Sequence, residues 1–216
     1  VTVHLGLALV LVSLLLVVYC RATLLDAEAE QAAVAEPLGP EAPMLRRLVG
    51  GVWCLAVVQI ALGANLRGTL EQLLEQVPLM NSLHRLEMAG TLRHLHFAFG
   101  VTVLAATVVA VFQFHRSRAL PGRFQTAIRV ALALVIVQAL VGMAFGRLGL
   151  APLLQVFHLW IATLFIGWIS ILYVALGHEH GARIVNGVVN PGFAVSSVIT
   201  NTVLLALAML AIQAAD

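Results

Sequence analysis

The chain has 216 residues, of which 61% are hydrophobic and only 10% are charged, and its formal net charge is +2. Because charged residues make up about a quarter of soluble domains, this composition excludes a soluble globular protein and predicts an all-α integral membrane protein in contact with lipid. No basic patch alternates with aromatic residues, which argues against nucleic acid as a partner.

Six apolar segments are long enough to cross a bilayer, whose hydrocarbon core takes about 20 helical residues. In chain order they are residues 1–20, 48–66, 94–114, 128–145, 153–176 and 193–212. We expect residues 1–21 to form a single transmembrane helix and residues 46–180 to form a four-helix bundle. Residues 181–216 add an extra C-terminal transmembrane helix.

Two connecting segments have a distinctive composition. Residues 22–45 contain five acidic residues and three prolines, which predicts an acidic, flexible cytoplasmic linker. Residues 69–77 carry apolar side chains at helical spacing, which predicts a short helix at the membrane interface on the opposite side.

The 12 basic residues are all arginines, and they divide unequally between the two sides of the predicted membrane. The side of the acidic linker holds Arg21, Arg46, Arg47, Arg116, Arg118, Arg123, Arg129 and Arg183. The other side holds Arg67, Arg85, Arg93 and Arg147. The positive-inside rule therefore places the first side in the cytoplasm and predicts a multi-pass protein of the cell inner membrane.

A short pattern, His-Leu-x-apolar-Ala, occurs three times and begins at His4, His94 and His158. All three copies lie at the outer end of their predicted helices, so the imidazoles would share one depth. A polar ring inside a membrane helix is costly unless it has a partner, which makes such residues functional candidates. Equal depth on parallel helices is the arrangement that a shared cofactor requires.

A second repeat relates the other two helices of the predicted bundle. Val58-Gln59 followed by Gly63 is echoed by Val137-Gln138 followed by Gly142, each just before an arginine. Residues 48–114 and 128–176 therefore look like two copies of one helical hairpin. We expect these copies to form a four-helix haem-binding bundle with approximate two-fold symmetry.

Neutral imidazole ligates haem iron axially, so we expect two of the histidines to hold a b-type haem near the outer face. His94 and His158 are the first choice because they occupy equivalent positions in the two hairpins, and His4 is a third candidate ligand. His96 competes with His94 because it begins the uninterrupted apolar run. His84 lies among charged residues and is expected outside the hydrocarbon.

The positions of the charged residues bear on both the haem site and the class of protein. Arg93, Arg85 and Arg147 lie on the outer side and are candidates to neutralise haem propionates. No Asp or Glu occurs within the six predicted spans. Since proton-coupled transport usually needs an intramembrane acid, this pattern argues against a proton-driven transporter.

Several of these segments resemble one family. The sequence Val-Gln-Ala-Leu-Val-Gly at 137–142, with Leu-Ala-Pro-Leu-Leu-Gln-Val-Phe-His-Leu-Trp-Ile-Ala-Thr at 150–163, resembles the last helix pair of haem A synthases. Val-His-Leu-Gly-Leu-Ala at 3–8 is similar to the fourth helix of that family. Members have eight helices in two four-helix halves, with two haem-ligating histidines in each half. The resemblance implies that residues 1–21 end an N-terminal half and that residues 46–180 form the C-terminal half.

The resemblance also implies a function, the oxidation of the methyl group of haem O to the formyl group of haem A. Haem b would then lie in the C-terminal half, and His4 would belong to the haem O or haem A site, with its partner in a missing N-terminal half or another membrane subunit. An alternative is a haem b electron-transfer subunit of a larger membrane redox complex. The outer loop 67–92 lacks a cysteine pair, and the family offers no counterpart for the helix at 193–212, which favours the alternative.

Overall fold

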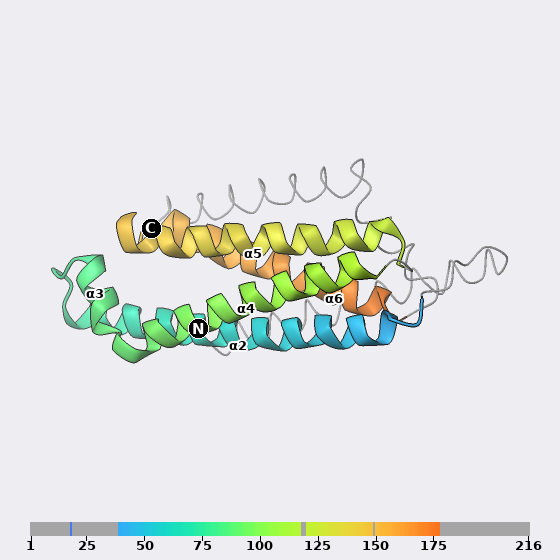
Figure 1. Ribbon diagram of the computed structural model, residues 1–216. Coiled ribbons are helices and arrows are strands. Elements are labelled where there is room, and N and C mark those ends of the chain that lie inside the picture. Colours follow the sequence, from blue (N-terminus) through green and yellow to red (C-terminus); the bar gives the residue numbers. More distant parts are fainter. Residues whose placement is uncertain (1–17, 19–38, 118–119, 149, 178–216) are drawn as a thin grey trace.

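The computed structural model describes residues 18, 39–117, 120–148 and 150–177, and five complete helices lie within these ranges (Figure 1). They are α2 (Ala42–Gln76), α3 (Ser82–Met88), α4 (Gly90–Arg116), α5 (Gly122–Leu148) and α6 (Pro152–Ala175). The described part of the chain contains no strand, so the prediction of an all-helical protein is confirmed there. The predicted helices at 1–21 and 181–216 and most of the 22–45 linker lie outside the described residues.

Four of the five helices, α2, α4, α5 and α6, are long and apolar enough to cross a membrane. They coincide with four of the six predicted spans. Such a set of helices is that of a multi-pass membrane protein. We call the end of the molecule at which α3 lies the α3 end; it holds the end of α2, the start of α4, the end of α5 and the start of α6 (Figure 1).

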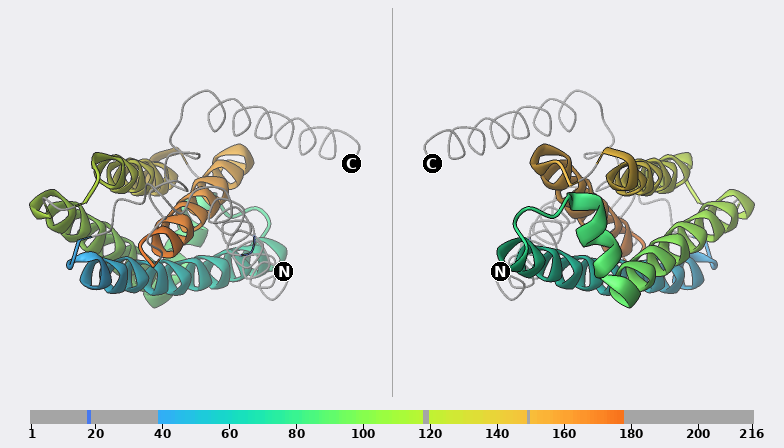
Figure 2. Two further views of the ribbon diagram at one scale, coloured as in Figure 1. Left: turned by 90° about the vertical axis from the view of Figure 1, so that its right-hand side faces the viewer. Right: turned by 90° about the vertical axis from the view of Figure 1, so that its left-hand side faces the viewer.

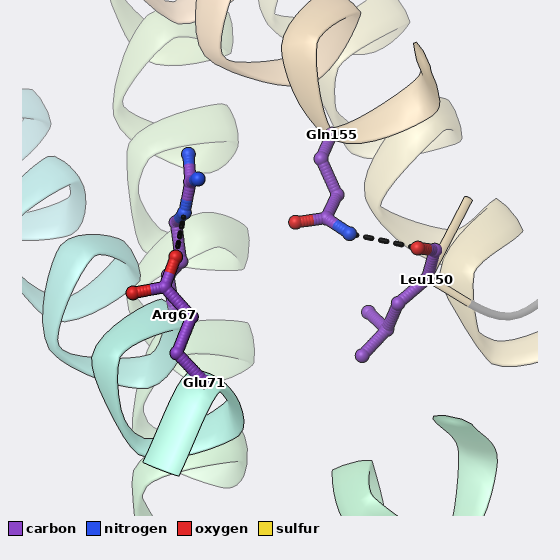
Figure 3. A network of polar contacts seen from close by, with 4 residues as sticks. All are labelled: Arg67, Glu71, Leu150 and Gln155. Carbon is purple, nitrogen blue, oxygen red and sulfur yellow. Dashed lines mark hydrogen bonds and ion pairs between the residues drawn. The ribbon is translucent and has the colours of Figure 1, made fainter. Parts of the chain in front are cut away.

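Helix α2 differs from the predicted span at both of its ends. It begins at Ala42, inside the predicted linker, because Pro43 takes a position in the first turn where its missing N–H is harmless. It then continues without a break to Gln76, so residues 69–76 are helical but do not form the separate interfacial helix that we predicted. An ion pair one turn apart, Arg67 Nε to Glu71 Oε1 at 2.8 Å, joins successive turns of this extension (Figure 3).

A short turn reverses the chain between α2 and α4. Helix α3 starts at Asn81, whose side-chain oxygen accepts a hydrogen bond from the His84 backbone N–H at 2.8 Å. Gly90 has a φ of +53°, a conformation that residues with a Cβ rarely adopt, and it lets α4 leave α3 in a new direction. Helix α3 contacts both α2 and α4. Viewed from the α3 end, it lies in front of the end of α2 and the start of α4 (Figure 2, right).

The four long helices surround one apolar core. Helix α2 packs on α4 and α6, and α5 also packs on α4 and α6, which gives the cyclic order α2, α4, α5, α6. Helices α4 and α6 therefore lie diagonally opposite each other. Two indoles tie neighbouring helices together: Trp53 Nε1 donates to Ser170 Oγ at 3.0 Å, and Trp168 Nε1 donates to the Ala127 carbonyl at 2.7 Å.

Buried residues recur along α2, α4 and α5 at steps of four, three and four residues, and along α6 at steps of four, four and three residues. Buried positions with this spacing are Leu45, Val49, Val52 and Ala56 in α2, Val103, Thr107, Ala110 and Phe114 in α4, Phe124, Ile128, Ala131 and Val135 in α5, and Ile161, Phe165, Ile169 and Leu172 in α6. An average spacing of 3.5 residues keeps one row of side chains against neighbours that cross at a shallow angle. We call each such row the core row of its helix.

Candidate functional site

Toward the α3 end the residues on the core rows change from apolar to polar or small. Continued by the same steps, they leave the apolar core and reach polar and small residues on all four helices. These residues, which we call the histidine site, are Gln59 and Gly63 of α2, His96 and Gly100 of α4, Gln138 and Gly142 of α5, and His158 of α6. The site is therefore a continuation of the core and not a feature of the lipid-facing surface.

His96 is held between α4 and α2. Its Nε2 lies 3.4 Å from Nε2 of Gln59, within hydrogen-bonding range when the ring nitrogen acts as the acceptor. Its Cε1 lies only 2.9 Å from where a Cβ at Gly63 would stand, so the ring occupies the space that this glycine leaves open. Gly100, one turn along α4, gives the Gln59 amide its own room, since a Cβ there would lie 3.1 Å from Gln59 Nε2.

His158 has an equivalent position in the second hairpin but different neighbours. Its Cε1 lies 3.3 Å from the position of a Cβ at Gly142, which corresponds to Gly63 in the repeat. The Phe145 ring of α5 approaches it edge-on, with 5.3 Å between the centroids and 72° between the planes. The first imidazole is thus packed beside an amide, and the second beside an aromatic ring.

Four polar atoms of the histidine site are buried and have no hydrogen-bond partner among the described residues: Nδ1 of His96 and His158, and Oε1 of Gln59 and Gln138. Buried polar atoms are nearly always paired, so orphaned nitrogens on two imidazoles point to a group that the described residues do not supply. The two rings come from diagonally opposite helices. Two imidazoles on opposite helices of a bundle are a donor set that haem iron accepts.

The structure separates His96 from the other histidine candidates. His94, two residues earlier on α4, is exposed and lies off the core row. A step of two residues turns a helix by about 200°, so His94 and His96 cannot both face the core. His84 is exposed on α3, where its Nδ1 lies 3.3 Å from Glu87 Oε2, and His4 lies outside the described residues.

The three predicted propionate-binding arginines also differ in placement. Arg85 of α3 is half-buried, and one of its guanidinium nitrogens, Nη1, is buried without a partner within the described ranges. Arg93 is half-buried, whereas Arg147 is exposed. Arg85 is therefore the arginine best placed to receive an anionic group at the α3 end.

Two other polar side chains at this end, Arg67 and Gln155, are paired within the protein. Arg67 is engaged with Glu71, and Gln155 Nε2 of α6 donates to the Leu150 carbonyl at 2.7 Å, both shown in Figure 3. Among the described residues, no group of three or more His, Cys, Asp or Glu side chains gathers that could hold a bare metal ion.

The glycines and glutamines of the site were visible in the sequence as a repeat but were not predicted as site residues. The signal was the spacing: from Val103, steps of three and four along α4 lead to Gly100 and His96 and pass over His94. The same steps along α2 lead from Ala56 to Gln59 and Gly63.

The comparisons with known proteins leave the chain unassigned. No family model, no curated protein and no solved structure matches it. The similarity to haem A synthases therefore rests on the sequence motifs, and function has to be argued from the histidine site.

Proposed function

We propose that this chain is a membrane haem protein that binds one b-type haem between His96 and His158 and passes electrons through it. One observation carries the proposal: two half-buried imidazoles, each with an orphaned ring nitrogen, occupy equivalent places in two helical hairpins. In this proposal the hairpins α2–α4 and α5–α6 form a pseudo-two-fold four-helix bundle, and His96 and His158 would hold the haem.

The choice of His96 over His94 follows from the core rows. A ligand must project between α4 and α6, and His96 lies on the row that faces the core whereas His94 is exposed. By local sequence alone His94 would be the counterpart of His158, because both begin a His-Leu-x-apolar-Ala pattern. We take packing as the stronger criterion because a ligand must reach the iron.

The remaining residues of the site have supporting roles in this proposal. Gly63 and Gly142 keep the imidazoles from being pushed toward the centre, and Arg85 offers an unpaired N–H to a propionate. The apolar core rows beyond the site exclude water from one side. When bound, the haem would supply one-electron redox chemistry, and His96 and His158 would be the residues that hold it. The excess of arginines at the opposite end supports a position of the proposed site near the outer face of the membrane.

A second candidate function is haem A synthase activity. The motifs at 137–142 and 150–163, which resemble the last helix pair of that family, favour it. In that case the haem b site is an electron relay, and haem O is the substrate of a second site that includes His4 and a partner outside this chain. Electron transfer is the function that the described residues support by themselves.

The decisive experiment is a reduced-minus-oxidised spectrum of the purified protein, with pyridine haemochromogen typing and haem counted per polypeptide. We expect about one haem b, lost in His96→Ala and in His158→Ala and retained in the matched control His94→Ala. Retention of the wild-type spectrum in His96→Ala would refute the assignment of His96, and a protein that binds no haem would refute the proposal. Haem A or haem O found together with haem b would favour the synthase.

A further inference from the structure

Gln59 is the feature of the histidine site that ligation alone does not explain. Its side chain is half-buried in a helix that crosses the membrane, where an amide is costly unless it is hydrogen-bonded. A glycine at position 100 leaves the space that the amide occupies, and a methyl group there would lie 3.1 Å from its nitrogen. An apolar side chain at position 59 would fill the same space without the cost of burying an amide, so packing alone does not explain Gln59.

We propose that Gln59 is a positioning residue for His96: its amide fixes the orientation and the protonation of the imidazole that holds the haem. This inference rests on the proposed haem site. A ligating imidazole uses one nitrogen for the metal and donates the N–H of the other to a neighbouring acceptor, which fixes the ring and raises its basicity. Gln59 stands beside one ring nitrogen of His96 at 3.4 Å, and the second ring nitrogen is buried without a partner in the described structure.

The orphaned oxygen of Gln59 fits this role. At present the amide nitrogen faces His96, and Oε1 is buried without a partner among the described side chains. A half-turn of the amide about its last bond exchanges these two atoms. The oxygen then accepts the N–H of the ring, and the other ring nitrogen carries the lone pair that a metal requires.

The second hairpin provides an internal comparison. Gln138 corresponds to Gln59 in the repeat, but no hydrogen bond joins it to His158 within the described residues. His158 instead has the edge of Phe145 against its ring. The proposal therefore makes the two histidines inequivalent, with only His96 tuned by an amide.

The test uses Gln59→Leu, Gln138→Leu and Gln113→Leu, the last removing a half-buried amide from α4 far from the site. The readouts are haem content and the midpoint potential in a redox titration. Loss of the acceptor makes the imidazole a poorer donor to ferric iron, so Gln59→Leu should keep its haem and shift the potential upward. A tenfold change in the ratio of ferric to ferrous affinity corresponds to about 59 mV, and we expect a shift of that order.

The controls decide the interpretation. Gln138→Leu should shift the potential by less than half as much, Gln113→Leu should leave it unchanged, and Gln59→Glu, which keeps an acceptor oxygen, should not raise it. Equal shifts in Gln59→Leu and Gln138→Leu, or an unshifted Gln59→Leu, would overturn the inference while leaving the haem site intact.

A second measurement does not depend on haem. In haem-free protein labelled with 15N-histidine, Gln59→Leu should move the ring-nitrogen resonances of His96 and leave those of His158 in place. Unmoved His96 resonances would contradict the contact itself. A wild-type protein that binds no haem would instead refute the proposed function and, with it, the positioning role of Gln59.

Discussion

The glycine beside each imidazole allows a graded test of the site, and Gly63→Ala is its most severe member. The added methyl group would stand 2.9 Å from His96 Cε1, about half an ångström short of ordinary van der Waals contact. The obstacle is a ring held by α4, not the free end of a flexible chain, so the ring or the helix must move. A shift of about 0.5 Å is already the tolerance within which a preorganised site holds its ligands.

The magnitude follows from two opposing effects. Replacing a helical glycine by alanine gains up to about 1 kcal/mol of helix stability, whereas overpacking a core costs about 1–3 kcal/mol. When the full gain is realised, the free energy of unfolding should fall by no more than about 2 kcal/mol, and the displacement of His96 should also appear as lost haem. We expect haem affinity to fall about tenfold, which corresponds to about 1.4 kcal/mol.

Two other glycines complete the series. Gly142→Ala places its methyl group 3.3 Å from His158 Cε1, a contact that a small movement relieves, so its haem affinity should fall less than about threefold. Gly51→Ala meets nothing within 4 Å and should bind haem as the wild type does, with an equal or slightly higher melting temperature. Haem titration of the three purified variants measures the order, and equal losses in all three, or an unaffected Gly63→Ala, would refute the reasoning.

Further predictions concern the packing between helices. Ser170→Ala leaves the Trp53 indole N–H, which now donates to Ser170 at 3.0 Å, without its acceptor and should lower the free energy of unfolding by about 1–3 kcal/mol in a thermal melt; an unchanged melting temperature would contradict it. Arg46→Met removes a guanidinium that lies 4.6 Å from the Tyr173 ring centroid and should cost about 1 kcal/mol by the same assay, with no effect on haem content. A loss of haem in Arg46→Met would show that the opposite end of the core controls the site.

Sequence reasoning located the spans well because membrane helices require long apolar runs. The segments at 48–66, 94–114, 128–145 and 153–176 each lie within, or extend one residue beyond, a helix of the structure. Their ends were less predictable. The pattern of residues 69–77 fits an interfacial helix and a helix that simply continues out of the membrane equally well, and the structure has the second arrangement.

The choice between His94 and His96 could not be made from hydrophobicity. Lipid-facing and core-facing residues of a membrane helix are both apolar, so amphipathic periodicity carries little information about which face is inside. In α4 the lipid-facing residues include Phe97 and Val101, which are as apolar as the buried Val103. The sequence pattern makes His94 the counterpart of His158, whereas packing in the structure makes His96 the counterpart of His158.

The difference between the hairpins bears on what the site can do. Each histidine lies beside a glycine of the neighbouring helix, but His96 also meets the Gln59 amide and His158 meets Phe145. If both imidazoles served only to hold a cofactor in place, an amide hydrogen-bonded to only one of them would bring a desolvation cost without a compensating gain. A redox centre, by contrast, has a use for one ligand whose donor strength is set by hydrogen bonding. If the proposed haem is bound, the inequivalence of the two sides therefore favours the proposed electron transfer over simple storage of haem.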